Sequence, residues 1–130
     1  MKRKQAREEA FILIFEKVFN SESVEEILEI ATEVRDLVPD DYIKTVFTGV
    51  YDNLETLDKI ITENSIGWSI GRISKTALSV LRLSLFEIKF MDDIPVSVSI
   101  NEAVELCKKY ATKDDASFVN GILSTVVKSL

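Results

Sequence analysis

The sequence predicts an all-α protein, and three observations support this fold class. Apolar residues recur at spacings of three and four along almost the whole chain, which is the period of a helix with one buried face. The two prolines, Pro39 and Pro95, fall between periodic segments, where they separate helices. No segment alternates apolar and polar residues over the length of a strand. The 130 residues, of which 46% are hydrophobic, suffice for one domain with a buried core.

Three helices are predicted in the first half of the chain. The first spans about residues 3–19 and carries an apolar stripe from Ala10 onward. The second begins near Ser23, because Glu26 three residues later completes the pattern of a capping box. The third spans residues 39–61, with a proline suited to its first position and two aspartates in its first turn.

A break in the periodic pattern separates two predicted helical subdomains. Residues 63–73 contain two glycines and no helical stripe, so they divide the chain into subdomains of roughly 1–63 and 74–130. The helix that follows, residues 74–90, is apolar around most of its circumference. It is therefore expected at the centre of the fold.

Two charged residues, Arg82 and Glu87, lie within this apolar helix. Burying a charge without a partner is too costly for a folded protein to tolerate. Each residue is therefore expected to reach the surface at the edge of the helix or to pair with a neighbour.

The last two helices are predicted from their N-terminal caps. Ser99 is expected to cap the first of them, with Glu102 three residues later, and this helix continues to about Tyr110. Asp114 or Asp115 is expected to cap the final helix, whose apolar stripe continues to residue 130.

The segment FVNGIL, residues 118–123, contains a turn dipeptide inside this final helix. Asn-Gly is a strong hairpin signal, but the helical spacing of the apolar residues around it outweighs that signal. Gly121 either lets another helix pack closely or leaves space for a ligand. Asn120 either forms a structural hydrogen bond or contacts a partner. Close packing and a structural hydrogen bond are the favoured alternatives.

The composition argues against catalysis and metal binding. The chain has no histidine and a single cysteine, and it lacks a glycine-rich phosphate loop and a nucleophile elbow. Cys107 falls on an apolar stripe, so it is expected to be a small core residue. No catalytic site, metal site or cofactor is predicted. The single cysteine, with no signal peptide and no membrane-length apolar run, indicates a cytoplasmic protein.

Positive charge is concentrated at the start of an otherwise acidic chain. The net charge is −6, yet Lys2, Arg3, Lys4 and Arg7 provide four of the 16 basic residues, and the 22 acidic residues all lie elsewhere. A helix N-terminus carries a partial positive charge, so these cations are repelled there and not stabilised. The cluster is either a solvated tail or a site for an anionic ligand such as RNA phosphate, and composition alone favours neither.

Four segments in a fixed order suggest a family relationship. They are AREEAFILIF, a tryptophan followed by RIS and VLRLSLFEI, IPVSVSINEAVELCKKY, and FVNGIL. Together they span the chain, and the set resembles the NusB family of bacterial transcription antitermination factors. The resemblance implies an all-helical, non-enzymatic protein that pairs with NusE, a small-subunit ribosomal protein. The pair is expected to bind boxA-type single-stranded RNA in ribosomal RNA transcripts, within the RNA polymerase antitermination complex.

The resemblance also implies which residues contact RNA and NusE. The residues that match RNA-binding positions of the family are Lys2, Arg3, Lys4, Arg7, Asp114 and Phe118. Phe118 is expected either to stack on an unpaired base or to belong to the core. Phe15, Phe19 and Ala77 match positions near the NusE contact.

Three features depart from the family pattern. Ala77 stands where the family often has an acidic residue, which implies one polar contact fewer with NusE. Ser117 stands where lysine is common, and the start of the chain has fewer arginines than many members. These features imply weak RNA binding by this protein alone. Some members form homodimers that cover the RNA surface, so a homodimer is a further expectation.

Two other functions are compatible with the sequence. A helical protein–protein adaptor without direct RNA binding would suit the acidic surface, but it leaves the basic start unexplained. NusB-like domains also precede RNA cytosine methyltransferase domains, and this chain would then need a separate catalytic partner. The RNA-binding antitermination factor is the favoured hypothesis.

Overall fold

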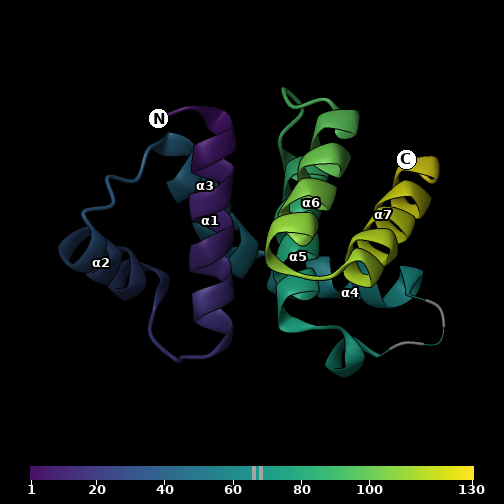
Figure 1. The fold of residues 1–130 in the computed structure, drawn as a ribbon, viewed down its shortest axis with the longest axis horizontal. Coiled ribbons are helices and arrows are strands. Elements are labelled where there is room, and N and C mark those ends of the chain that lie inside the picture. The colour runs from purple at the N-terminus through teal and green to yellow at the C-terminus, as the bar shows by residue number, and fades with distance from the viewer. Residues whose placement is uncertain (66, 68) are drawn as a thin grey trace.

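The computed structural model describes residues 1–65, 67 and 69–130, and this part of the chain folds into helices joined by short loops (Figure 1). The all-α prediction is confirmed. The elements are α1 (Arg3–Val18), α2 (Val24–Arg35), α3 (Asp41–Asp52), α4 (Leu54–Asn64), η1 (Ile70–Arg72, a 3-10 turn), α5 (Lys75–Phe90), α6 (Val96–Tyr110) and α7 (Lys113–Lys128). Trp68, which belongs to the family resemblance, lies outside the described residues, as does Ile66. None of the described helices is long and apolar enough to cross a membrane.

Helix α5 is the centre of the fold. It packs against α1, α3, α4, α6 and α7. Figure 1 shows α1 to α3 on one side of it and α7 on the other. Every residue from Ala77 to Ile88 is buried, which explains why the helix is apolar around most of its circumference. The predicted central position is confirmed.

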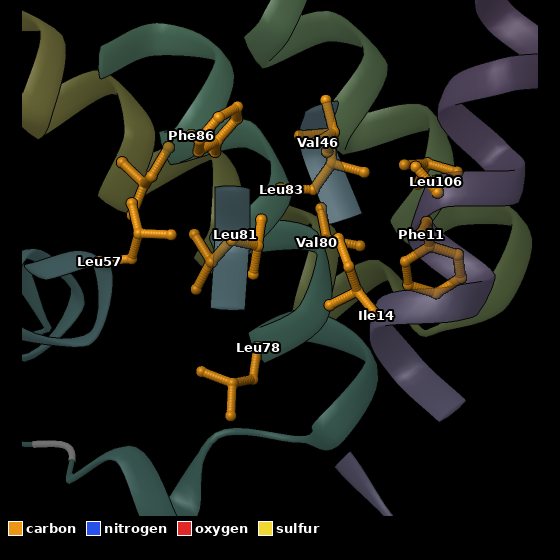
Figure 2. Close-up of a cluster of buried hydrophobic side chains, with 14 of the residues drawn as sticks. Phe11, Ile14, Val46, Leu57, Leu78, Val80, Leu81, Leu83, Phe86 and Leu106 are labelled. Carbon is orange, nitrogen blue, oxygen red and sulfur yellow. The ribbon is translucent and has the colours of Figure 1, made fainter. Parts of the chain in front are cut away.

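The hydrophobic core is continuous between the two ends of the chain. Figure 2 shows Phe11 and Ile14 of α1 near Val80 and Leu83 of α5 and Leu106 of α6, and all five side chains are buried. A fully buried side chain of this size contributes about 1.5–3 kcal/mol relative to an exposed one. These contacts fix the first helix on the C-terminal half of the molecule.

The prediction of one helix over residues 39–61 is wrong, because two helices occupy this region. Asp40 caps α3 by accepting a hydrogen bond of 2.9 Å from a backbone N–H of the first turn, so Pro39 precedes the helix. At the other end, Asn53 donates from its backbone N–H (3.0 Å) and its side-chain amide (2.8 Å) to the carbonyl oxygen of Gly49. An asparagine side chain competes with backbone hydrogen bonds in this way, and the helix ends there.

The predicted capping boxes have different outcomes. Ser23 and Glu26 form the predicted box at the start of α2. Ser99 does not cap α6, because this helix begins three residues earlier, at Val96. Ser99 lies in the interior instead, where its hydroxyl binds a buried carboxylate.

The cap of the final helix also differs from the prediction. Thr112 caps α7, because its hydroxyl accepts a hydrogen bond of 3.0 Å from the backbone N–H of Asp115. Asp114 and Asp115 occupy the first turn, where carboxylates interact favourably with the helix dipole. The aspartates were therefore a correct signal for a helix start but not the cap itself.

Helix α4 packs mainly against the C-terminal half. It contacts α5 and α7 in addition to α3, so it has different packing partners from α3, which contacts α1, α2 and α5. Arg82 of α5 donates two hydrogen bonds of 2.9 Å to the carboxylate of Asp58 in α4. The predicted pairing of Arg82 with a neighbour is confirmed, and this pair fixes α4 on α5.

Two helical glycines have opposite surroundings. Gly121 is exposed, and a Cβ atom built on it would meet nothing within 4 Å, so the prediction of close packing at this position is wrong. The neighbouring Asn120 is also exposed and lines an open groove between α6 and α7. Close packing occurs instead at Gly49 of α3, where an added Cβ would overlap the ring of Phe86.

Candidate nucleic-acid interface

The first turn of α1 carries the predicted basic cluster at the surface. Lys2, Arg3 and Lys4 are exposed, and the turn contains no acidic residue. Each cation at a helix N-terminus costs a few tenths to about 1 kcal/mol, so this arrangement does not stabilise the helix. An anionic ligand would find three cations within one turn.

Two of these exposed cations are held by neighbouring side chains. The guanidinium of Arg3 lies 4.6 Å from the ring centroid of Tyr42, a cation–π geometry. The Lys4 ammonium lies 3.2 Å from the Glu102 carboxylate of α6, while its side chain remains 69% exposed. The cations are therefore partly ordered before a ligand arrives.

The structure corrects the prediction for Arg7. This residue is only 3% exposed, and its Nε donates a hydrogen bond of 2.8 Å to Glu87. Burial alone would lower the pKa of Arg7, but the hydrogen bond and negative charge of Glu87 outweigh that effect and raise the pKa. Its guanidinium therefore binds inside the protein and does not belong to the exposed basic cluster.

The carboxylate of Glu87 joins four helices. It is fully buried in α5 and accepts hydrogen bonds from Arg7 of α1, from the hydroxyl of Tyr42 of α3 and from Ser99 of α6, the last at 2.7 Å. Burial and the neighbouring negative charge raise the pKa of Tyr42 well above its ordinary value, so its hydroxyl stays protonated and remains a donor. Of the two predictions for Glu87, pairing is confirmed and surface exposure is wrong.

A row of alternating charges lies where side chains of α1 meet those of α6, and we call it the α1–α6 seam. Its residues line a depression of about 150 Å³ and are Lys4, Arg7, Glu8, Glu102, Glu105, Leu106 and Lys109. Glu8 accepts hydrogen bonds from Lys109 at 2.6 Å and from the hydroxyl of Tyr110, and these bonds lower the pKa of Glu8. No local pattern in the sequence indicates the seam, because its partners are about 100 residues apart.

Asp114 and Phe118 lie at a second position, at the start of α7. Asp114 is exposed, whereas Phe118 is half-buried and packs against the core. Together with Arg72, Ile73 and Asp115 they line a pocket of about 260 Å³. Figure 1 shows that α7 begins at the opposite end of the molecule from the start of α1. The pocket combines an aromatic edge, a guanidinium and two carboxylates, groups that can stack on a base and bind its polar edge.

Aromatic side chains extend along α1 toward its C-terminal end. Phe15 is half-buried and Phe19 is 63% exposed, and their ring centroids are 5.0 Å apart. An exposed ring of this size is typical of a protein contact. The structure corrects the prediction for Ala77, whose methyl group is fully buried in α5 and cannot reach a partner.

The predicted role of Cys107 as a core residue is confirmed. The side chain is fully buried, and this burial raises the pKa of its thiol to about 12. A thiol with this pKa is a poor nucleophile at neutral pH. Within the described residues, no group of three or more histidine, cysteine, aspartate or glutamate side chains could hold a metal ion.

Comparison with known proteins gives a consistent result. The sequence model of the NusB family matches residues 4–128. The transcription antitermination protein NusB of Ruminiclostridium cellulolyticum is 45% identical in an alignment 130 residues long. The alignment covers 98% of this chain and 90% of that protein.

Solved structures match as well. NusB of T. maritima superposes with a TM-score of 0.86 at 34% identity, covering 98% of this chain and 92% of that one. A chain from a crystal structure of the antitermination factors NusB and NusE in complex with dsRNA gives a TM-score of 0.87 at 28% identity, covering 98% and 97%. Family model, relative and structures agree over nearly the whole length, so this chain belongs to the NusB family.

Proposed function

We propose that this protein is a non-catalytic, cytoplasmic, RNA-binding antitermination factor. It pairs with NusE, binds boxA-type single-stranded RNA in ribosomal RNA transcripts and acts within the RNA polymerase antitermination complex. The observation that carries the proposal is the basic first turn of α1, which costs helix stability and has its cations held at the surface. The membership of the NusB family supports the same function.

RNA contacts are assigned to two positions. Lys2, Arg3 and Lys4 bind phosphates, which fix the position of the strand. Asp114 and Phe118 bind a base at the pocket beside α7, where the ring of Phe118 serves both the core and the pocket. Arg7, whose guanidinium is buried, acts indirectly by holding α1 against α5.

NusE is assigned to the aromatic surface of α1. Phe15 and Phe19 present adjoining rings, and the second is largely exposed. A solved structure with a similar chain contains NusB and NusE together with dsRNA, as its name states. A homodimer of the kind expected from the sequence would cover the RNA surface and would therefore compete with RNA.

A protein–protein adaptor without direct RNA binding is the second candidate. The exposed Phe19 and the net charge of −6 favour it. It differs from the main proposal in one measurable respect, because it predicts NusE binding that does not depend on RNA or on the basic turn.

The test is a titration of boxA-type RNA with and without NusE across a range of salt concentrations. The variant replaces Lys2, Arg3 and Lys4 by glutamine. A phosphate contact to a single strand contributes about 0.7 to the logarithmic salt slope, so the variant should bind more weakly with a slope reduced by about two.

A matched control keeps the change in net charge the same. It replaces three exposed lysines outside the basic turn by glutamine, namely Lys44, Lys59 and Lys128. The control should bind RNA nearly as the unmodified protein does. Equal RNA affinity of the basic-turn variant and the unmodified protein would remove the assigned RNA site. NusE binding that is unaffected by RNA, with no RNA binding by the chain without NusE, would favour the adaptor.

A further inference from the structure

One cation of the basic turn already has a protein anion as its partner. The Lys4 ammonium donates a hydrogen bond of 3.2 Å to Oε2 of Glu102, across the α1–α6 seam. An RNA phosphate that binds Lys4 must take the place of this carboxylate or share the ammonium with it. Arg3 differs, because the neighbour of its guanidinium is the uncharged ring of Tyr42.

The carboxylate of Glu102 is also held from the interior. Arg7 Nη1 lies 3.9 Å from the same Oε2 atom that binds Lys4. The side chain of Arg7 is 4% exposed, and that of Glu102 is 24% exposed. Because Arg7 is itself fixed by Glu87, Glu102 remains beside the basic turn when Lys4 moves away.

We infer that Glu102 is an intramolecular competitor of RNA phosphate for Lys4, and that it sets the RNA affinity and salt dependence of the basic turn. The inference rests on the proposed function of the turn as an RNA site. The inference assigns a role to Glu102 at the basic turn, where the sequence alone indicates only the cations. In the free protein the Lys4 ammonium is paired with Glu102, so an RNA phosphate that binds Lys4 competes with this carboxylate.

The competition has a consequence for ions in solution. When Lys4 binds a phosphate, RNA releases a cation. The carboxylate of Glu102 loses its ammonium partner at the same moment and attracts a cation from solution. The net release of ions is therefore smaller than the number of phosphate contacts implies. Removing the carboxylate of Glu102 should restore the full release of ions and make the RNA affinity depend more steeply on salt concentration.

The experiment measures binding of a labelled boxA-type single-stranded RNA to the full chain together with NusE, at several salt concentrations. The test variant is Glu102→Gln. Its matched control is Glu105→Gln, which removes one negative charge from the same helix and the same seam, where Glu105 pairs with Lys108 at 3.6 Å. Both variants are repeated in a Lys4→Gln background.

Glu102→Gln should bind RNA about two- to fivefold more tightly at low salt, since an exposed ion pair of this kind has an effect of that size. Its salt slope should steepen by up to about 0.7. Glu105→Gln should produce a smaller gain. In the Lys4→Gln background, the difference between the two variants should vanish. Glu102→Ala, which lacks the amide as well, should change affinity in the same direction as Glu102→Gln.

Two results would overturn the inference. In one, Glu102→Gln binds RNA no more tightly than Glu105→Gln. In the other, the gain persists without Lys4, which would assign it to general repulsion. Failure of the proposed function looks different, because the unmodified protein would then bind no RNA with or without NusE at any salt concentration.

Discussion

Two ion pairs lie within one turn of each other on α1, and they differ in burial. Arg7 and Glu87 are enclosed, with side chains 4% and 0% exposed, and the acid has two further donors. Lys4 and Glu102 lie at the surface, with side chains 69% and 24% exposed. The first pair cannot be separated without leaving a charge in the core, whereas either member of the second can turn to water. Burial thus decides which cation supports the fold and which can bind a ligand.

The largest expected effect comes from breaking the buried pair. Glu87→Gln removes the buried counter-charge of the Arg7 guanidinium and leaves only the more distant Glu102 carboxylate, 3.9 Å from Nη1. Breaking a buried pair in this way typically costs about 3–5 kcal/mol. The free energy of unfolding, measured by urea titration, should fall by this amount. Lys4→Gln, which breaks the exposed pair, should change it by less than about 1 kcal/mol. Similar losses from the two variants would show that burial does not distinguish the pairs.

The sequence reveals features whose parts are close along the chain. Ser23 and Glu26 are three residues apart and act on the same turn, so their capping box is predictable. Glu87 has partners 80, 45 and 12 residues away, and no local pattern indicates them. Lys4 and Arg7 look alike in the sequence, since both are cations on one helix, and only the packing of α5 and α6 separates their roles.

The misplaced helix boundaries have a similar explanation. Asn53 could be exposed within a long helix or could end a helix, and its two bonds to Gly49 decide the outcome. Ser99 followed by Glu102 has the spacing of a cap, but the hydroxyl is taken by Glu87. In both cases a polar side chain has more than one satisfactory partner, and tertiary packing selects among them.

Two glycines, one exposed and one packed against a ring, allow a second comparison of surface and interior positions. Alanine favours a helix by about 1 kcal/mol over glycine. Gly121→Ala should therefore stabilise the protein by up to about 1 kcal/mol, because the added methyl group meets open space. Gly49→Ala should destabilise it by about 1–2 kcal/mol, because overlap with Phe86 outweighs the helix preference.

Thermal unfolding of both glycine variants against the unmodified protein measures this difference. The decisive result is that the two changes in stability have opposite signs, because both variants make the same replacement of glycine by alanine. If Gly49→Ala raised the melting temperature as much as Gly121→Ala does, the ring of Phe86 would have room to move and the close approach would not be required.

The smallest expected effect concerns the pH dependence of the seam. Hydrogen bonds from Lys109 and Tyr110 lower the pKa of Glu8 below its unfolded value. Glu8 therefore contributes stability above the unfolded pKa and loses it as the pH falls through the folded pKa. The contribution is less than about 1 kcal/mol, because the carboxylate is partly exposed.

Urea unfolding at pH 7 and at pH 3 measures this contribution. The unmodified protein should exceed Glu8→Gln in stability at pH 7, and the difference should shrink at pH 3. If the stability difference between the unmodified protein and Glu8→Gln were the same at both pH values, the negative charge of Glu8 would not contribute to stability.

The partners of α1 are made long after α1 itself. Arg7 precedes Glu87 by 80 positions, and Lys4 precedes Glu102 by 98. A growing chain leaves the ribosome from its N-terminus. The carboxylate partners of Lys4 and Arg7 are therefore absent while the first two-thirds of the chain are made, although the ring partner of Arg3, Tyr42, is already present. Lys4 and Arg7 become different from each other only when α5 and α6 emerge, so a partly made chain carries more unpaired positive charge at this helix than the finished protein does.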